Sequence, residues 1–381
     1  MIKVLCVFGT RPEAIKMAPL VKELAKYPNE IISKVAVTAQ HREMLDQVLD
    51  LFAIKPDYDL DIMHNQQTLT QITTRALEGL DKVYEEEKPN LVLVHGDTTT
   101  TCVASLGAFY RQIAIGHVEA GLRTGNKYSP FPEEMNRKIT GAIADFHFAP
   151  TTTAKENLLR ENIAPEAITV TGNTVIDALL ATVQESFPLA QVPGLDKVDF
   201  TKRVILVTAH RRENLGEPMR QIFNGLREIA LEFPETEIVF PVHKNPKVRS
   251  VVHEVLGNLP QVHLIEPLDY QPFVNLMARA DLVLTDSGGL QEEAPALGKP
   301  VLVLRDTTER PEAVEAGTVS LVGTGFDGVY AETKRLLTDP LYYEKMANAV
   351  NPYGDGKAAQ RIVQSIRYIF KLSTEKCREY I

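Results

Sequence analysis

The chain alternates short apolar, β-branched runs with longer amphipathic stretches, and this alternation limits the possible folds more than any other feature. The N-terminal runs are KVLCVFG (3–9), KVAVTA (34–39), NLVLVHGD (90–97), IAIGHVE (113–119) and AITVTGN (167–173). Between the second and third runs, apolar residues from Ile72 to Tyr84 recur with a period near 3.6, which is typical of one helix face. Strands that are apolar throughout and alternate with such helices predict a parallel sheet covered on both faces.

The pattern lapses at 181–201, where prolines and a glycine interrupt it, and then restarts. The second set of runs is RVILVTAH (203–210), EIVFPVH (237–243), QVHLIEP (261–267), DLVLTDSGG (281–289), PVLVLRD (300–306) and TVSLVG (318–323). A length of 381 residues leaves room for two domains of roughly 150 residues each. We therefore predict two doubly wound α/β domains, at 1–180 and 200–356, followed by a last helix. Such sheets bind ligands at the carboxyl ends of their strands, so we expect two facing sheets with a cleft between them.

Charge and cysteine usage narrow the class of ligand and the compartment. The chain has 41 Lys and Arg residues against 50 Asp and Glu residues, a net charge of −9, which argues against nucleic-acid or anionic-membrane binding. It contains no run of about 18 apolar residues that would predict a membrane-spanning helix. Three cysteines without a CxxC pair, and an N-terminus unlike a signal peptide, predict a cytoplasmic protein with a small-molecule ligand.

Two strand-end loops have the residues of anion sites. In the first, Gly9 permits a sharp turn, and Arg11 and Lys16 stand at the start of a predicted helix. In the second, Ser287 is placed to cap a helix, and Gly288 and Gly289 allow backbone N–H groups to approach a phosphate. Each loop has a plainer interpretation as an ordinary strand-turn-helix connection. Two such loops in opposite halves of the chain would suit a diphosphate.

Acidic and imidazole side chains also collect at predicted strand ends, namely Asp97, Glu119, His210 and His243. A carboxylate just past a buried strand can act as a general acid or base when partial desolvation raises its pKa. Asp97 has the alternative role of capping the next helix. Glu133 has a strong structural alternative, because a helix dipole favours acids in the first turn.

Other polar positions leave two interpretations open. Arg305 and Arg310 would either grip phosphate or sugar oxygens or pair with Asp306 and Glu309. Phe273 is, on spacing alone, typical of a core aromatic residue. The chain has no HExxH motif and no Cys/His cluster, so we expect neither a metal nor a cofactor.

Taken together, these motifs closely resemble those of the bacterial non-hydrolysing UDP-N-acetylglucosamine 2-epimerases. The matching segments run in the family's order over essentially the whole chain: FGTRPEAIKMAPL (8–20), VTAQHREMLDQVL (37–49), LVHGDTTTT (93–101), GHVEAGLRTG (116–125), SPFPEEMNR (129–137), TGNTVIDAL (171–179), AHRRENLG (209–216), LTDSGGLQEEAPALGKPVLVLRDTTERPE (284–312) and NPYGDG (351–356). The resemblance implies two Rossmann-like domains of the glycosyltransferase-B type, the second binding UDP. It also implies a C-terminal helix, within about 357–381, that packs back on the first domain, and usually a homodimer.

The implied activity is the reversible conversion of UDP-N-acetylglucosamine to UDP-N-acetylmannosamine for cell-surface polysaccharides. Direct deprotonation at C2 is unattractive because C2 is not next to a carbonyl. Loss of UDP across C1–C2 gives a 2-acetamidoglucal, and re-addition with a proton on the other face inverts C2. This scheme needs an acid/base group on each sugar face and a site for the leaving diphosphate. The rivals are a hydrolysing epimerase that releases N-acetylmannosamine and UDP, a glycosyltransferase of the same fold, and a non-catalytic UDP-sugar sensor.

The resemblance also assigns residues. The catalytic positions are Asp97, Glu119, Glu133 and His210, with Asp97 and Glu133 as the expected proton-transfer pair. Arg11 and Ser287, Gly288 and Gly289 would hold the diphosphate, Glu293 the ribose, Phe273 the uracil, and Lys16 and Arg310 the phosphate or sugar region. Some family members bind a second UDP-N-acetylglucosamine as an activator, and the positions that match this allosteric site are Gln40, His41, Gln67, Arg211 and His243.

Overall fold

The computed structural model describes residues 1–39, 42–63 and 67–380, and the chain forms two compact units. Unit 1 comprises residues 1–181 and 353–381, and unit 2 comprises residues 182–352. Within the described ranges, no helix combines the length and the apolar character needed to cross a membrane.

Unit 1 is built on a parallel sheet of seven strands in the order β3-β2-β1-β4-β5-β6-β7. The strands are β1 (Ile2–Phe8), β2 (Ile31–Val37), β3 (Tyr58–Asp59), β4 (Leu91–His95), β5 (Ala114–Val118), β6 (Phe146–Ala149) and β7 (Ile168–Val170). The helices are α1 (Arg11–Leu24), α2 (Arg42–Leu51), α3 (Leu69–Glu87), α4 (Thr99–Tyr110), α5 (Glu133–Ile143), α6 (Thr152–Arg160), α7 (Thr174–Thr182) and α15 (Ala358–Ile369). A 3₁₀ turn, η1 (Pro165–Ala167), precedes β7.

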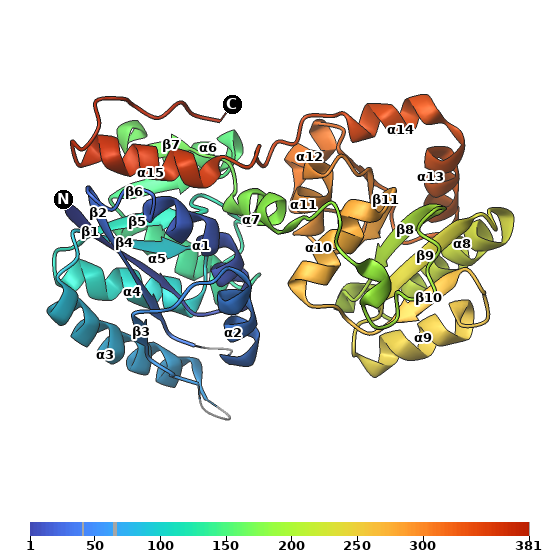
Figure 1. The fold of residues 1–381 in the computed structure, drawn as a ribbon, viewed down its shortest axis with the longest axis horizontal. Helices are drawn as coiled ribbons and strands as arrows, with labels where there is room; N and C mark the ends of the chain where they lie inside the picture. The colour runs from blue at the N-terminus through green and yellow to red at the C-terminus, as the bar shows by residue number, and fades with distance from the viewer. Residues whose placement is uncertain (40–41, 64–66, 381) are drawn as a thin grey trace. The chain divides into compact units, whose positions relative to one another are not determined.

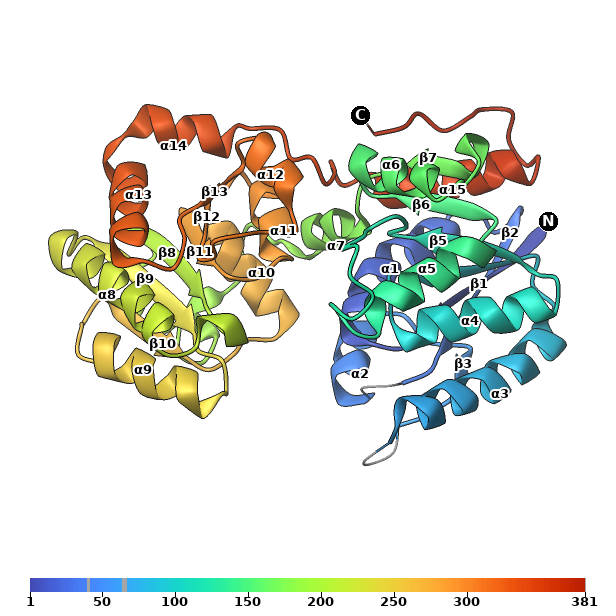
Figure 2. The same ribbon diagram turned by 180° about the vertical axis from the view of Figure 1, so that it is seen from behind.

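Helices cover both faces of this sheet, as the alternation predicted. Helices α3, α4 and α5 lie side by side on one face, and α1 packs against α2 and α15 on the other (Figures 1 and 2). The predicted helix face around 72–84 is confirmed, because Ala76, Leu80, Val83 and Tyr84 are buried. Leu80, Val83 and Tyr84 pack with buried strand residues such as Leu5 in one core cluster. Strands β3 and β6 were not predicted, since β3 has only two residues and a histidine interrupts the apolar run of β6.

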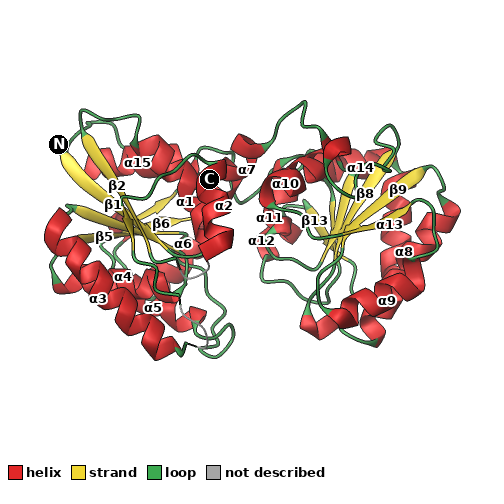
Figure 3. Ribbon diagram, turned by 60° about the horizontal axis from the view of Figure 1, so that its bottom comes forward, coloured by secondary structure: helices red, strands yellow, loops and turns green. Residues whose placement is uncertain are grey.

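Unit 2 has a six-stranded parallel sheet in the order β10-β9-β8-β11-β12-β13. The strands are β8 (Arg203–Thr208), β9 (Thr236–Pro241), β10 (Val262–Ile265), β11 (Leu282–Thr285), β12 (Val301–Val303) and β13 (Val319–Leu321). The helices are α8 (Glu217–Glu232), α9 (Pro246–Leu256), α10 (Tyr270–Arg279), α11 (Leu290–Ala296), α12 (Pro311–Glu315), α13 (Phe326–Thr338) and α14 (Pro340–Ala347), with 3₁₀ turns η2 (Leu189–Gln191) and η3 (Arg212–Asn214). Figure 3 shows helices on both sides of this sheet as well.

The two sheets share the same strand order, because each starts at its centre, grows to one side and then switches to the other. This is the doubly wound Rossmann order, and it confirms the predicted α/β class. Long amphipathic helices supply the covering layers: α8, for example, buries Ile222, Phe223 and Leu226 in a cluster that includes Phe240.

The last helix, α15, belongs to unit 1 although it follows unit 2 in the chain. Its first two N–H groups, those of Ala358 and Ala359, donate to the Asp177 carboxylate of α7 at 3.1 and 2.8 Å. Near its other end, Arg367 pairs with Glu30 at 2.7 Å. A hydrogen-bonded cap and an ion pair therefore hold the two ends of α15 against the N-terminal part of the chain.

Candidate active site

The strand order places the predicted residues at particular edges of the two sheets. In each sheet the winding reverses between two central strands, which are β1 and β4 in unit 1 and β8 and β11 in unit 2. Ligands of open α/β sheets bind beyond the carboxyl ends of the strands at such a switch point. The loops that follow these four strands contain 9–11, 96–98, 209–211 and 286–289.

In unit 1, the start of α1 is occupied by a buried carboxylate, that of Glu13. It accepts the N–H groups of Gly9 and Thr10 at 3.1 and 2.8 Å, and the hydroxyl groups of Thr98 and Thr101 at 2.6 and 3.1 Å. Thr10 in turn caps the helix, which completes a capping box with Glu13. The expectation that exposed N–H groups of this loop form an anion site is therefore wrong for Gly9 and Thr10, because Glu13 already uses them.

Lys16 and Glu119 form one ion pair at the end of β5. Glu119 also accepts a hydrogen bond from the Asn173 side chain at 3.0 Å, and His95 Nε2 lies 3.6 Å from the Glu119 carboxylate. Burial lowers the pKa of His95 to about 4, so this histidine is neutral near pH 7. Glu119 has a φ of 60°, in the left-handed region that non-glycine residues seldom adopt. Such a conformation persists where the surroundings fix it, and it is common at functional sites.

Asp97 is held by two residues of α5. Its carboxylate pairs with the Arg137 guanidinium, and its backbone oxygen accepts the Asn136 side-chain amide at 2.9 Å. Helix α4 is capped by Thr98, whose hydroxyl accepts the Thr101 N–H at 3.1 Å. The alternative interpretation of Asp97 as a helix cap is therefore wrong. The chain instead fixes this carboxylate at the switch point of unit 1.

The two neighbouring acids at the start of α5 differ in their surroundings. Glu134 is fully buried and accepts the N–H groups of Thr124 and Gly125, both at 3.1 Å. Glu133 is half-buried, and no described residue donates a hydrogen bond to its carboxylate or pairs with it. Glu134 thus has a structural role, because it holds the backbone of Thr124 and Gly125, while the Glu133 carboxylate is bound by no described residue.

In unit 2, the switch point brings His210 against Asp286. The Asp286 carboxylate accepts the backbone N–H groups of His210 and Arg211, both at 2.8 Å. His210 Nδ1 lies 3.3 Å from the other carboxylate oxygen of Asp286. The His243 ring stacks on His210 with 5.4 Å between centroids. Arg211 extends from the same loop and pairs with Glu309 at 3.0 Å.

The glycine loop after β11 keeps its backbone donors. Ser287 donates its N–H to Thr285 at 2.9 Å, and the cap position of α11 is Gly289 without a side-chain cap, so the prediction of Ser287 as helix cap is wrong. Within the part of the chain that the structure describes, the N–H groups of Gly288 and Gly289 have no hydrogen-bond partner. A Cβ on Gly288 would lie 2.8 Å from Glu309, so the loop is closely packed there.

The remaining predicted binding residues surround the same loop. Arg310 pairs with Glu292 of α11, whereas Arg305 pairs with Glu309 at 2.5 Å and with Glu213 at 3.0 Å. The surface-pairing interpretation is therefore confirmed for Arg305, which pairs with Glu309. It is wrong for Arg310, whose ion-pair partner is Glu292 instead of Asp306 or Glu309. Phe273 is half-buried and lies outside the buried side of α10, so it is not a core residue. Glu293 is half-buried in the first turn of α11.

Comparison with known proteins identifies the family. A sequence profile described as UDP-N-acetylglucosamine 2-epimerase matches residues 22–367. The UDP-N-acetylglucosamine 2-epimerase of Bacillus subtilis is 61% identical over 375 residues, which are 98% of this chain and 97% of that protein. The chain belongs to the UDP-N-acetylglucosamine 2-epimerase family.

Solved structures agree with this family and with the fold class. The Neisseria meningitidis UDP-GlcNAc 2-epimerase bound to UDP-GlcNAc has a TM-score of 0.85 and 54% identity, covering 96% of this chain and 99% of that chain. Sucrose-phosphate synthase from Thermosynechococcus elongatus has a TM-score of 0.64 at 13% identity, covering 97% of this chain and 100% of that chain, and so shows the fold alone. These findings confirm two Rossmann-like domains of the glycosyltransferase-B type.

Several residues that support this epimerase-family site were missed in the sequence. His117 and His147 are buried register neighbours on β5 and β6, and burial lowers their pKa values to about 3 and about 4. His117 Nε2 bonds the Gly96 oxygen at 2.7 Å and so supports the residue before Asp97. Asn136 and Arg137 stood in a quoted motif, but sequence order could not show that they reach Asp97.

The five positions that match the activator site of the family are only partly described. Gln40 and His41 lie outside the described residues. Gln67 donates its side-chain amide to the Ile62 oxygen at 2.5 Å in unit 1. Arg211 and His243 both lie beside His210 in unit 2.

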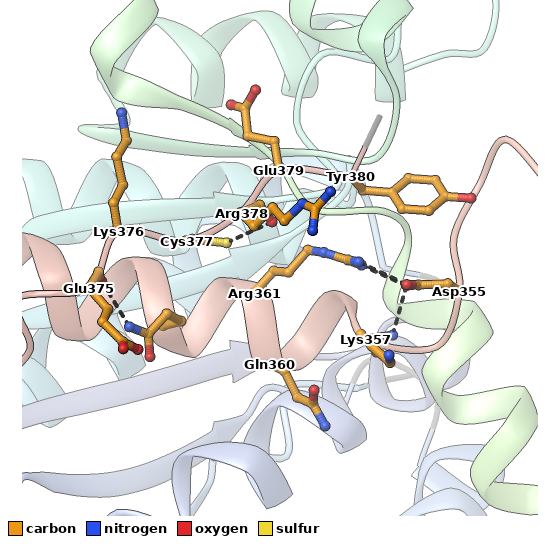
Figure 4. A pocket seen from close by; sticks show the side chains of 11 residues that line it. Asp355, Lys357, Gln360, Arg361, Glu375, Lys376, Cys377, Arg378, Glu379 and Tyr380 are labelled. Atoms are coloured by element: carbon orange, nitrogen blue, oxygen red, sulfur yellow. Dashed lines mark hydrogen bonds and ion pairs between the residues drawn. The ribbon is translucent and has the colours of Figure 1, made fainter.

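The described residues contain no group of three or more His, Cys, Asp or Glu side chains that could hold a metal ion. An open pocket of about 720 Å³ lies elsewhere in unit 1, between α15 and the C-terminal segment (Figure 4). Arg361 pairs there with Asp355 at 2.6 Å and lies 5.1 Å from the centre of the Tyr380 ring. None of the predicted site residues lines this pocket.

Proposed function

We propose that this chain is an isomerase that interconverts UDP-N-acetylglucosamine and UDP-N-acetylmannosamine by inverting C2, without a cofactor. Its family membership and its similarity to enzymes with this name support the proposal. The observation that carries it is the pair of carboxylates at the ends of β4 and β5. Asp97 and Glu119 follow adjacent strands, and Arg137 and Lys16 hold them in place.

The chemistry needs proton transfer at C2 on both faces of the sugar. Asp97 is fixed through α5, and the same helix presents Glu133, whose carboxylate no described residue binds, one helical turn before Arg137. One group removes the C2 proton as UDP leaves, and the other returns a proton to the opposite face of the 2-acetamidoglucal. Glu119, paired with Lys16, positions the sugar.

Unit 2 is the part of the chain that we assign to UDP, and residues 200–356 are the proposed nucleotide-binding domain. The N–H groups of Gly288 and Gly289, which no described residue accepts, suit a diphosphate, and backbone donors that are fixed before binding stabilise charge effectively. Phe273 has an accessible ring for uracil, and Glu293 carries acceptors for the ribose hydroxyl groups. Residues 1–180, with the C-terminal helix, form the proposed domain for the sugar chemistry, where Arg11 and Lys16 reach the phosphate or sugar.

We also propose that a second UDP-N-acetylglucosamine activates the enzyme through Gln40, His41, Gln67, Arg211 and His243. Support comes from the contact of the His243 ring with His210, because a ligand on His243 would touch a catalytic group. Initial rates with UDP-N-acetylmannosamine, with and without a trace of UDP-N-acetylglucosamine, test this. Stimulation by the trace is expected, and unchanged rates without a lag count against activation.

A homodimer in the cytoplasm completes the proposal. The free thiols of all three cysteines fit a reducing compartment.

The proposed dimer has a candidate interface on two helices of unit 1. Phe109 and Tyr110 of α4 and Ile139 of α5 are 53%, 65% and 41% exposed on helices that pack together, and exposed apolar patches often mark interfaces. Sedimentation equilibrium should give twice the chain mass. Monomers at all concentrations would oppose the dimer.

Proton NMR of the reaction mixture tests the activity. With UDP-N-acetylglucosamine alone, the expected product is UDP-linked N-acetylmannosamine, formed without an acceptor. A free reducing sugar with UDP would favour the hydrolysing epimerase, and turnover only with an acceptor would favour a glycosyltransferase. Binding without turnover would favour the UDP-sugar sensor.

A further inference from the structure

The carboxylate of Asp286 is a buried charge that the proposed mechanism has not used. Its side chain is 0% exposed at the switch point of unit 2, directly after β11. No lysine or arginine side chain among the described residues pairs with it; the group at ion-pair distance is His210. An isolated buried carboxylate is costly, so the contacts that compensate it deserve a functional explanation.

The two oxygens of Asp286 have different roles. Oδ2 accepts the backbone N–H groups of His210 and Arg211, both at 2.8 Å, and the Asn214 amide lies 3.4 Å away. Oδ1 has no hydrogen-bond partner among the described residues and lies 3.3 Å from His210 Nδ1. One oxygen therefore fixes the backbone of the loop, and the other remains for the imidazole ring.

We propose that Asp286 is a positioning residue for His210. It accepts the Nδ1–H and stabilises the imidazolium form, whose Nε2–H donates a hydrogen bond to the departing diphosphate of UDP. The inference rests on the proposed function and assigns the partner through which His210 acts. With Nδ1–H directed to Asp286, a neutral ring would have a bare Nε2, so His210 donates to the diphosphate only as the imidazolium.

The pKa of His210 should depend strongly on Asp286, because the other groups around the ring oppose its protonation. Burial lowers the pKa of His210, and the charges of His243 and Arg211 act in the same direction, whereas Asp286 raises it. Arg211 is partly compensated by Glu309 at 3.0 Å. On the facing ring, His243 Nδ1 accepts the Asn245 N–H at 3.1 Å. Among the facing groups that act on His210, Asp286 is thus the one that favours the imidazolium, and the anionic diphosphate adds to it when it binds.

Asp286→Asn is the direct test, because the amide keeps the size of the side chain and removes the charge. The Asn oxygen still accepts the two backbone N–H groups, and its NH₂ would donate to Nδ1 of the neutral ring. The neutral ring would then keep an Nε2–H, but an uncharged donor stabilises the diphosphate less than the imidazolium does. The matched control is Asp281→Asn, at the other end of β11, where the carboxylate accepts the Val204 N–H at 2.7 Å. The measurements are kcat and KM against pH, the Kd for UDP, and NMR titration of the His210 ring.

For Asp286→Asn we expect kcat to fall at least tenfold, a Kd for UDP within threefold of wild type, and a His210 pKa lower by one unit or more. The alkaline limb of the pH profile should move to lower pH by a similar amount, since the imidazolium is lost earlier. Asp281→Asn should leave the limb and the titration unchanged. A His210 titration in Asp286→Asn equal to that of wild type would overturn the proposal, whatever the loss of rate.

A measurement on the wild-type protein covers the case in which Asp286→Asn fails to fold. Long-range ¹⁵N NMR of neutral His210 should show the proton on Nδ1, and a proton on Nε2 would contradict the assignment. These readouts need no turnover. If wild-type protein bound UDP but never inverted C2, the proposed function would fail, while the titration and tautomer would still decide the role of Asp286.

Discussion

At the scale of single residues, the acids of unit 1 divide by what their oxygens already bind. Glu13 and Glu134 are buried, and backbone N–H groups use their oxygens, so they shape loops. Asp97 and Glu119 are each held by one cation, and Glu133 has no partner among the described residues. This difference separates structural carboxylates from those available for proton transfer.

Asp97→Asn and Glu133→Gln should each lower kcat by about 10²–10⁴, the usual contribution of a general acid or base. Both should retain UDP binding, because UDP is assigned to unit 2. Glu156→Gln, on the exposed side of α6, is the control and should have wild-type kinetics. Initial rates and calorimetric titration with UDP measure both quantities. A kcat within threefold of wild type for either variant would remove that residue from the proton-transfer pair.

Among single residues, the sequence could predict the strand-end acids and His210 but not the side chains that hold them. Asp97, Glu119 and His210 could be predicted because each directly follows an apolar strand or nearly so. The pairs Arg137–Asp97 and Lys16–Glu119 could not, since their partners lie 40 and 103 positions apart in the chain. Side-chain partners across loops depend on register and helix rotation, which local pattern does not specify.

At the scale of elements, Gly9 lets the loop after β1 approach the loop after β2 and the first turn of α4. A Cβ at this position would lie 2.0 Å from the Thr38 hydroxyl oxygen and 2.6 Å from that of Thr100, which are hydrogen-bonded to each other at 2.8 Å. Gly9→Ala must therefore displace the loop that carries Arg11. We expect a loss of about 1–3 kcal/mol in unfolding free energy, as for other overpacked sites, together with weaker substrate binding.

Gly325→Ala is the matched control for this prediction, because a Cβ there meets nothing within 4 Å. Urea unfolding of the two variants and of wild type gives the comparison. Equal unfolding midpoints for Gly9→Ala and wild type would show that Gly9 is not closely fitted against Thr38 and Thr100.

The attachment of α15 should depend on pH through Asp177. Burial raises the pKa of Asp177 to about 6, against about 3.9 in an unfolded chain. The folded state therefore binds the proton more tightly, and the stability this contributes is complete below pH ~4 and is lost as the pH rises through ~6. Relative to Asp177→Asn, wild type should lose up to about 3 kcal/mol over this range.

Asp355 should affect the pH dependence of the unfolding free energy in the opposite direction, and Asp355→Asn tests this. Arg361 lowers the pKa of Asp355, so the stability from this pair is present at neutral pH and is lost as the pH falls. Urea-unfolding midpoints of wild type and both variants between about pH 2 and pH 7 test the two signs, because the Asp355 carboxylate gains its proton only below about pH 4. A constant difference between wild type and Asp177→Asn would contradict the shifted pKa.

Most elements could be predicted because strong apolar runs mark them. The exceptions have physical causes: β3 has two residues, β6 contains the buried His147, and the start of α11 lacks the side-chain cap expected from Ser287. The anion site expected at α1 failed because the Glu13 carboxylate accepts the N–H groups of Gly9 and Thr10, a contact that the local pattern did not indicate. Short strands and buried polar groups carry weak hydrophobic signals.

At the scale of the whole molecule, two sheets with the same strand order supply two switch points with different chemistry. Unit 1 gathers carboxylates that cations hold, and unit 2 gathers backbone donors and the His210–Asp286 pair. The sequence could predict the repeated architecture from its alternation. It could name Asp97, Glu119 and His210 as candidates from their strand-end positions, whereas their catalytic roles, and Glu133 as a member of the set, came only from the resemblance.

The central claim is that C2 loses its proton and regains one from the enzyme on the opposite face. The most direct test is to convert UDP-N-acetylglucosamine in heavy water and examine C2 of the product by NMR. Because the proton on the returning group exchanges with solvent, we predict deuterium at C2 of essentially every molecule of UDP-N-acetylmannosamine. Conversion with the original hydrogen retained at C2 would contradict the elimination mechanism and the roles of Asp97 and Glu133.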